Sequence, residues 1–187
     1  TVIGTKFIAN RCHVNNLVNE TGSTVVLAGG TGGSVFTNCL WVGNQNVNFS
    51  VTEAVNGGGG EVRILGSDKE DKYDFVNCTF AANLNDVTTL SGGVINARVG
   101  TVDVKNCIFA TNISPGSRTS GASDIASSAN SVVNISYSIF ESHDCLYCPP
   151  DGVMNLGRGI IFGEAKLISS TTPLRFMLQY GQYNAPY

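Results

Sequence analysis

Short apolar runs separated by clusters of Gly, Asn and Ser follow one another along the whole chain. Within the runs apolar and polar side chains alternate, as Val102 and Val104 do with Asp103 and Lys105. A period of two indicates a strand with one buried face. No stretch of a dozen residues keeps apolar spacings of three and four without a Gly, Asn or Thr-rich break. The pattern therefore predicts an all-β fold of many short strands, with helix as a minor element at most.

Five nine-residue windows of the sequence align with one another without gaps. They read VIGTKFIAN, FTNCLWVGN, FVNCTFAAN, VKNCIFATN and ISYSIFESH, and they begin at residues 2, 36, 75, 104 and 135. The aromatic residue in each window recurs every 29 to 39 residues. Such a period is typical of a solenoid, in which loops of variable length are inserted into a constant frame. We expect one domain, residues 1–187, with the repeats in residues 1–143 and a terminal coil and cap or exchange segment in residues 144–187.

Each column of the aligned windows has its own chemical character. The sixth position is aromatic: Phe7, Trp41, Phe80, Phe109 and Phe140. The fourth position is small: Thr5, Cys39, Cys78, Cys107 and Ser138. The third position holds Gly4, Asn38, Asn77, Asn106 and Tyr137. The ninth position holds Asn10, Asn44, Asn83, Asn112 and His143.

The alternation within a window breaks at its third position, which predicts a corner there. From Val104 to Cys107 is three residues, so both side chains reach the interior only if the chain bends at Asn106. Asn tolerates the left-handed backbone that such a bend often needs. If the coils stack about 4.8 Å apart, Asn38, Asn77 and Asn106 form a ladder along the corner, as in a parallel β-helix.

The same stacking places the small and aromatic columns inside the coil. We interpret Cys39, Cys78 and Cys107 as buried small residues rather than disulfide partners, because Thr and Ser fill the same column in the first and last windows. The aromatic column is expected to stack through the core and to supply much of its buried area.

The amino-acid composition argues against several classes of protein. Only 13% of the residues are charged, the net charge is −3, and the 22 glycines accompany 42% hydrophobic residues. Low charge and high apolar content exclude ordinary disorder. The acidic balance, without a basic stripe, argues against a nucleic-acid partner. No apolar run approaches the roughly 18 residues needed to cross a bilayer, so no membrane-spanning segment is expected in this chain.

The windows resemble the repeats of the polymorphic outer membrane protein family of bacterial autotransporters. FxxN motifs lie at Phe7–Asn10, Phe80–Asn83 and Phe109–Asn112, and a GGxI motif lies at 92–95. Beyond residue 143, the chain is weakly similar to the terminal coils of choice-of-anchor β-helix proteins. The resemblance implies a right-handed parallel β-helix, displayed extracellularly or at the outer membrane and often acting in adhesion. It supplies no catalytic motif, and together with the repeat it predicts about five to six coils.

Catalysis has little support in the sequence. Polysaccharide cleavage on a β-helix needs paired carboxylates or a basic residue beside a bound cation. No two Asp residues are adjacent in the sequence. Arg98, Asp103 and Lys105 are expected to face outward on one sheet, which keeps a lyase or hydrolase as an alternative.

Two clusters in the sequence contain residue types that can bind metal ions or form a disulfide. Asp68, Glu70, Asp71 and Asp74 lack the regular spacing and Gly of a calcium loop, so we interpret the cluster as a solvated loop tip. Cys145 and Cys148 lie outside the inner column, and either a local disulfide or two free thiols fits them. No cofactor and no metal ion is predicted.

The two ends of the chain suggest a route to assembly. Thr1 is not a Met and Val2 already occupies the first column, so we expect a mature or excised piece whose first coil another segment or molecule covers. The closing stretch carries aromatic residues that are candidates for a cap or for an exchange with a neighbouring copy. These are Phe176, Tyr180, Tyr183 and Tyr187.

These observations favour an exported, non-catalytic surface protein that binds a host or neighbouring-cell surface or a glycan. Its flat polar faces and the loops around residues 45–72 and 113–131 are expected to make the contacts. A structural subunit of a head-to-tail extracellular fibre is the first alternative. A polysaccharide lyase or hydrolase is the second.

Overall fold

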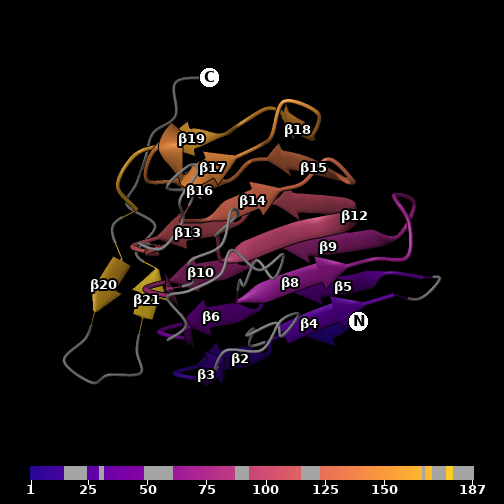
Figure 1. Ribbon diagram of the computed structural model, residues 1–187. Coiled ribbons are helices and arrows are strands. Elements are labelled where there is room, and N and C mark those ends of the chain that lie inside the picture. Colours follow the sequence, from indigo (N-terminus) through magenta and orange to yellow (C-terminus); the bar gives the residue numbers. More distant parts are fainter. Residues whose placement is uncertain are drawn as a thin grey trace.

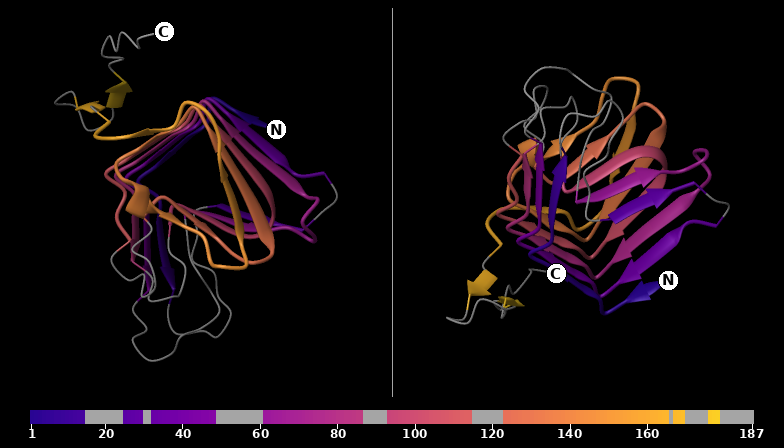
Figure 2. Two further views of the ribbon diagram at one scale, coloured as in Figure 1. Left: turned by 90° about the horizontal axis from the view of Figure 1, so that it is seen from above. Right: turned by 60° about the horizontal axis from the view of Figure 1, so that its bottom comes forward.

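The structure, a computed structural model, describes residues 1–14, 25–29, 32–48, 61–86, 93–114, 123–165, 167–169 and 176–178. It is all-β with parallel sheets, which confirms the fold class expected from the alternation and is consistent with a parallel β-solenoid (Figure 1). In the end-on view of Figure 2 the strands of successive turns lie over one another around a three-sided outline. One short 3₁₀ helix, η1 (His143–Cys145), is present among these residues.

Wall 1 is the sheet of strands that begin each repeat. It consists of β1 (Val2–Ile3), β5 (Ser34–Thr37), β9 (Lys72–Val76), the carboxyl-terminal half of β12 (Ile95–Lys105), β15 (Ser131–Ser136) and β18 (Val153–Leu156). Its strands pair parallel and in register, so that Phe36 pairs with Phe75 and Phe75 with Val104. One residue from each window therefore stacks on its counterpart in the next.

Wall 2 carries the aromatic column. It consists of β2 (Lys6–Ile8), β6 (Leu40–Val42), β10 (Thr79–Ala81), β13 (Ile108–Ala110), β16 (Ile139–Phe140) and β19 (Ile161–Phe162). A short parallel sheet follows it, made of β3 (Arg11–Val14), β7 (Gln45–Asn48) and β11 (Leu84–Asp86). The windows thus pair in the structure in the order in which they align in the sequence.

Wall 3 closes the outline. It consists of β4 (Val25–Ala28), β8 (Val62–Leu65), the amino-terminal half of β12, β14 (Ile125–Ser127) and β17 (Leu146–Tyr147). β12 belongs to both wall 1 and wall 3 because the strand bends between them. The bend is marked by a register shift between Ala97 and Val99 and by a positive φ of 121° at Gly100. Outside the walls, β20 (Leu167–Ser169) and β21 (Phe176–Leu178) pair antiparallel.

The corner between walls 1 and 2 lies at the third window position. Every residue there has a positive φ, including Gly4 at 61°, Asn77 at 55° and Tyr137 at 50°. The left-handed backbone reverses the alternation for one residue, which returns the next small side chain to the interior. A second corner follows wall 2, where Ala9, Gly43, Ala82 and Thr111 also have positive φ.

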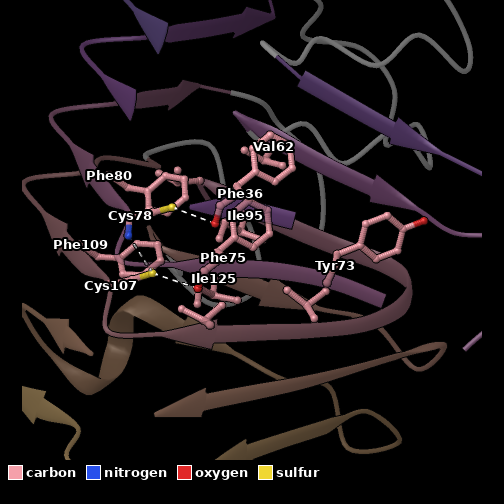
Figure 3. Close-up of a cluster of buried hydrophobic side chains, with 14 of the residues drawn as sticks. Phe36, Val62, Tyr73, Phe75, Cys78, Phe80, Ile95, Cys107, Phe109 and Ile125 are labelled. Carbon is pink, nitrogen blue, oxygen red and sulfur yellow. Dashed lines mark hydrogen bonds between the residues drawn. The ribbon is translucent and has the colours of Figure 1, made fainter. Parts of the chain in front are cut away.

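The core fills the space between the three walls. Phe75 and Val104 from wall 1, Phe80 from wall 2, and Ile64 and Ile95 from wall 3 are at most 1% exposed. Figure 3 shows the rings of Phe80 and Phe109 lying one over the other, with Phe36 and Phe75 facing them. Apolar side chains of all three walls thus meet in one core, and the alternate residues face outward.

Candidate functional site

The aromatic column forms a continuous stack along wall 2. Ring centroids are 4.7 Å apart for Phe7 and Trp41, 4.6 Å for Trp41 and Phe80, 4.8 Å for Phe80 and Phe109, and 4.7 Å for Phe109 and Phe140. These distances match the spacing between paired strands, about 4.8 Å. The rings are within 13° of parallel, and the four from Trp41 to Phe140 are completely buried. From Trp41 to Phe140 the column is part of the core and presents no surface to a ligand, while Phe7 at its first position is partly buried.

The small column of Cys39, Cys78 and Cys107 is also buried, and the three thiols are free. Each Sγ donates to the carbonyl two residues before it, and the Cys107 Sγ also accepts the Cys78 backbone N–H at 3.4 Å. The hydrogen bond with Cys78 and burial raise the pKa of the Cys107 thiol far above its usual range. Burial also raises the pKa of the Cys39 thiol, so Cys39 and Cys107 are hydrogen-bonded thiols and poor nucleophiles.

The third-position asparagines lie on the surface at the corner. Asn38, Asn77 and Asn106 are exposed, and the Asn106 amide donates to Asn77 Oδ1 at 2.7 Å. Asn is suited to this position because of the left-handed backbone there, and not because the side chain is buried.

The ninth-position asparagines form a ladder at the second corner, which is buried from Asn44 to Asn112. Nδ2 of Asn10, Asn44 and Asn83 donates to Oδ1 of the next asparagine at 2.9 to 3.0 Å. The backbone N–H of each of these residues donates to the same acceptor. Asn112 ends the ladder by donating to Asp124 Oδ1 at 2.9 Å. The aligned windows reveal both columns of asparagines, but they do not predict that the ninth-position column is the buried one and the third-position column the exposed one.

Cys145 and Cys148 are free, half-buried thiols, so the structure does not contain the local disulfide considered from the sequence. Between them lies β17, which pairs with β14 through Leu146 and Tyr147. The extended chain places the two Cα atoms roughly 10 Å apart, and a disulfide requires no more than about 7 Å. Pairing of β17 therefore keeps the thiols separate.

Of the predicted assembly residues, only Phe176 lies in the described chain, where its backbone is part of β21. Tyr180, Tyr183 and Tyr187 lie outside the described residues, and the exchange segment stays a prediction.

The outward face of wall 1 brings together polar side chains that are distant in sequence. Asp74, Asp103, Asn134 and Asn155 lie in register on β9, β12, β15 and β18. The Asn155 amide donates to Asn134 Oδ1 at 2.8 Å, and the Asn134 amide donates to Asp103 Oδ1 at 2.6 Å. We call this row the wall 1 ladder. Its amides all donate in one direction, toward the two carboxylates.

A groove of about 340 Å³ lies along this ladder. It is lined by Asp103, Val104, Lys105, Asn134, Ile135, Ser136, Asn155, Leu156 and Gly157. Lys105 and Ser136 are cross-strand neighbours, so an ammonium group and a hydroxyl lie beside the ladder. At the corner next to Ser136, the Tyr137 side chain is 52% exposed.

Asp74 and Asp103 are paired residues on neighbouring strands, although no two aspartates are adjacent in the sequence. Partial burial and the charge of Asp103 raise the pKa of Asp74, while Lys72 opposes the shift. Asp103 also has the Asn134 amide as a donor to its charged form. The arrangement offers fixed acceptors and donors for hydroxyl groups.

The sequence contains a pattern that predicts this site, and it lies one residue before the nine-residue windows. Asp74, Asp103 and Asn134 each come directly before the first residue of a window. Extending the alignment by one residue places them in one column, together with Val35.

The predicted grouping of Arg98 with Asp103 and Lys105 on one sheet is wrong. Arg98 lies in the half of β12 that pairs with β8 in wall 3, whereas Asp103 and Lys105 lie in wall 1. The register shift near Arg98 and the bend at Gly100 separate them.

Two of the acidic residues at 68–74 accept hydrogen bonds from backbone N–H groups of their own turn. Asp71 Oδ2 accepts the Ser67 N–H at 2.6 Å, and Asp68 Oδ1 accepts the Glu70 N–H at 2.8 Å, while Asp74 belongs to wall 1. Within the described ranges, no three His, Cys, Asp or Glu side chains gather closely enough to hold a metal ion.

Comparison with known proteins adds no assignment: no family model, no curated protein and no solved structure matches the chain. In the part of the chain that the structure describes, no helix has the length and apolar character to cross a membrane.

Proposed function

We propose that this chain is an exported, non-catalytic surface protein that binds glycans of a host or neighbouring cell through the outward face of wall 1. In this proposal residues 1–187 form one right-handed parallel β-helix of about five to six coils, as in the polymorphic outer membrane proteins that its repeats resemble. The scaffold is stiff because each coil pairs along its length with the next.

The wall 1 ladder with its groove is the observation that carries the proposal. Two amides, the Asp103 carboxylate, a hydroxyl and an ammonium group line a groove on a rigid sheet. The amides and the carboxylate are held by hydrogen bonds before a ligand arrives, which suits the hydroxyls of a sugar because little of their side-chain entropy remains to be lost. The strand spacing of about 4.8 Å is comparable to the length of one sugar ring.

Tyr137 adds an exposed apolar face beside the polar groups of the groove. Its ring stands 52% exposed at the corner beside Ser136, where it offers an apolar face next to polar groups. Tyr rings with one apolar face and a polar end are frequent in binding sites. Five of the nine residues that line the groove have hydrogen-bonding side chains, and none of the nine is an aromatic residue or Met, which are typical of a protein interface.

A glycan array followed by calorimetry tests the proposal. We expect a glycan ligand whose affinity falls about tenfold in Asn134→Ala and in Lys105→Ala, since each removes a hydrogen-bonding group from the groove. Lys6→Ala, an exposed substitution on β2 of wall 2, is the matched control and should bind like the parent. Absence of any glycan ligand, or equal binding by all four proteins, would overturn the proposal.

The in-register Asp74 and Asp103 favour glycoside hydrolysis as a second candidate. Neighbouring strands place paired residues about 4.8 Å apart, close to the roughly 5–5.5 Å between carboxyls of retaining glycosidases. Partial burial raises the pKa of Asp74, as a general acid requires. Release of reducing ends from a bound glycan, lost in both Asp74→Asn and Asp103→Asn, would establish this activity in place of simple binding.

A further inference from the structure

Arg63 is the most unusual charged residue of wall 3. It lies in β8 between Val62 and Ile64, whose side chains belong to the core. Strand alternation places the Arg63 side chain on the opposite, outward face. Even so, the residue is only 5% exposed.

The Arg63 guanidinium lacks partners for two of its nitrogen atoms. Nε and Nη1 are buried and make no hydrogen bond. An arginine stays protonated in proteins, so these are donors on a permanent charge. Buried polar groups are almost always hydrogen-bonded, and an unsatisfied one calls for a partner such as a bound ion.

The electrostatic surroundings of Arg63 also favour a negatively charged partner. Burial, and then the like charge of Arg98, lower the pKa of Arg63. Arg98 lies on the adjacent half of β12, next to the residues that pair with β8. No carboxylate is among the causes of the Arg63 pKa shift: neither the completely buried Glu61, two residues before Arg63, nor the buried Asp124 at the start of β14, which accepts the Asn112 amide.

We propose that Arg63, with Arg98 beside it, forms a binding site for a small oxyanion group: a carboxylate, sulfate or phosphate. Arg63, which is buried with unused donors and feels the like charge of Arg98, is stabilised once a negative group lies against it. Planar guanidinium groups match the oxygen geometry of these anions. The site lies on wall 3 and does not depend on glycan binding at wall 1.

Three probes distinguish the sources of the anion: inorganic sulfate, inorganic phosphate and D-glucuronate. Thermal unfolding and calorimetry are run in a non-coordinating buffer, with NaCl at matched ionic strength and with glucose as the uncharged counterpart of glucuronate. We expect at least one probe to raise the melting temperature and to bind at one site per chain, since a ligand that binds only the folded state stabilises it. The responding probe identifies a free ion or an acidic sugar as the source.

Arg63→Met, Arg63→Lys and Arg98→Met test the assignment, and Lys6→Met is the matched control. Arg63→Met should abolish the shift and should be at least as stable as the parent without anion, because it removes an unpaired buried charge. Arg63→Lys and Arg98→Met should weaken binding at least about tenfold, since each loses a charge-assisted contact or its geometry. Lys6→Met should leave binding unchanged.

Two results would overturn this site. One is the absence of any probe effect on the parent protein beyond that of NaCl, which needs no variant to fold. The other is a probe effect that persists in Arg63→Met or Arg63→Lys. Loss of glycan binding in the wall 1 variants bears only on the proposed function, because those residues lie on another wall.

Discussion

At the scale of single residues, hydrogen-bonded columns stabilise the interior where apolar contacts alone would leave polar groups unsatisfied. Asn83 illustrates this. Its amide donates to Trp41 O at 3.1 Å and to Asn112 Oδ1, and its Oδ1 accepts both the backbone and the side-chain N–H of Asn44. One buried side chain thus satisfies groups on both neighbouring turns, as buried polar networks must.

We predict that Asn83→Ala lowers the free energy of unfolding by about 2–4 kcal/mol, because it leaves buried donors of Asn44 without an acceptor. Asn155→Ala, the same substitution at an exposed position, should cost much less. Urea unfolding of the two variants and the parent checks this, and equal losses for both variants would contradict it.

Tyr137 occupies the left-handed corner position with φ at 50°. Asn and Gly adopt this backbone more readily than Tyr does. Tyr137→Asn should therefore raise stability by about 0.5–1 kcal/mol, while it weakens glycan binding at the neighbouring groove. A variant less stable than the parent in thermal unfolding would show that ring packing over Gly159, and not the backbone, dominates at this corner.

Asp124 introduces a pH dependence of stability. Burial raises its pKa to about 7, above its value in the unfolded chain. The folded state therefore holds a proton that the unfolded state releases, so this group favours folding at low pH and loses that contribution as pH rises toward 7. We expect Asp124→Asn to remove this dependence and to be the more stable protein at pH 8, as measured by unfolding at several pH values. A difference between parent and variant that is constant with pH would contradict the assignment.

At the scale of elements, register is the property that positions both core and site. In the stack of wall 2, Trp41 pairs with Phe80 and Phe80 with Phe109. The same register places Asp103 beside Asp74 and Asn134 in wall 1. A slip by one residue would turn the aromatic column outward and break the wall 1 ladder together.

Phe80→Ala should destabilise the protein by about 3–5 kcal/mol, because it empties the centre of a completely buried stack. Phe80→Leu, which keeps most of the volume, should cost clearly less. Chemical denaturation of both variants measures the difference, and a Phe80→Ala variant as stable as Phe80→Leu would show that the stack collapses around the gap.

Much of this register could be predicted from the sequence, because the columns of the windows are the pairs of the sheets. The break in alternation at Asn106 also predicted the corner. Arg98 was misplaced because the bend of β12 depends on a register shift to β8 that no repeat reveals. The partnership of Asp74 with Asp103 follows from the same columns once the alignment is extended by one residue, whereas the burial of Arg63 on an outward face has no signal in the repeat.

At the scale of the whole molecule, three walls around one core present separate outward faces on a rigid frame. The face of wall 1 carries the ladder and groove, and wall 3 carries Arg63 and Arg98. Because each face is built from in-register strands, a ligand that follows the axis meets similar groups on successive turns. Of these faces, we expect wall 1 to be the one that binds a glycan.

Mapping a bound glycan onto the isotopically labelled protein by NMR titration tests that claim most directly. We predict that the shifted backbone amides cluster on β9, the carboxyl-terminal half of β12, β15 and β18, with Asn134 and Lys105 among them. Shifts confined to wall 2 or wall 3, with wall 1 unchanged at saturation, would contradict it.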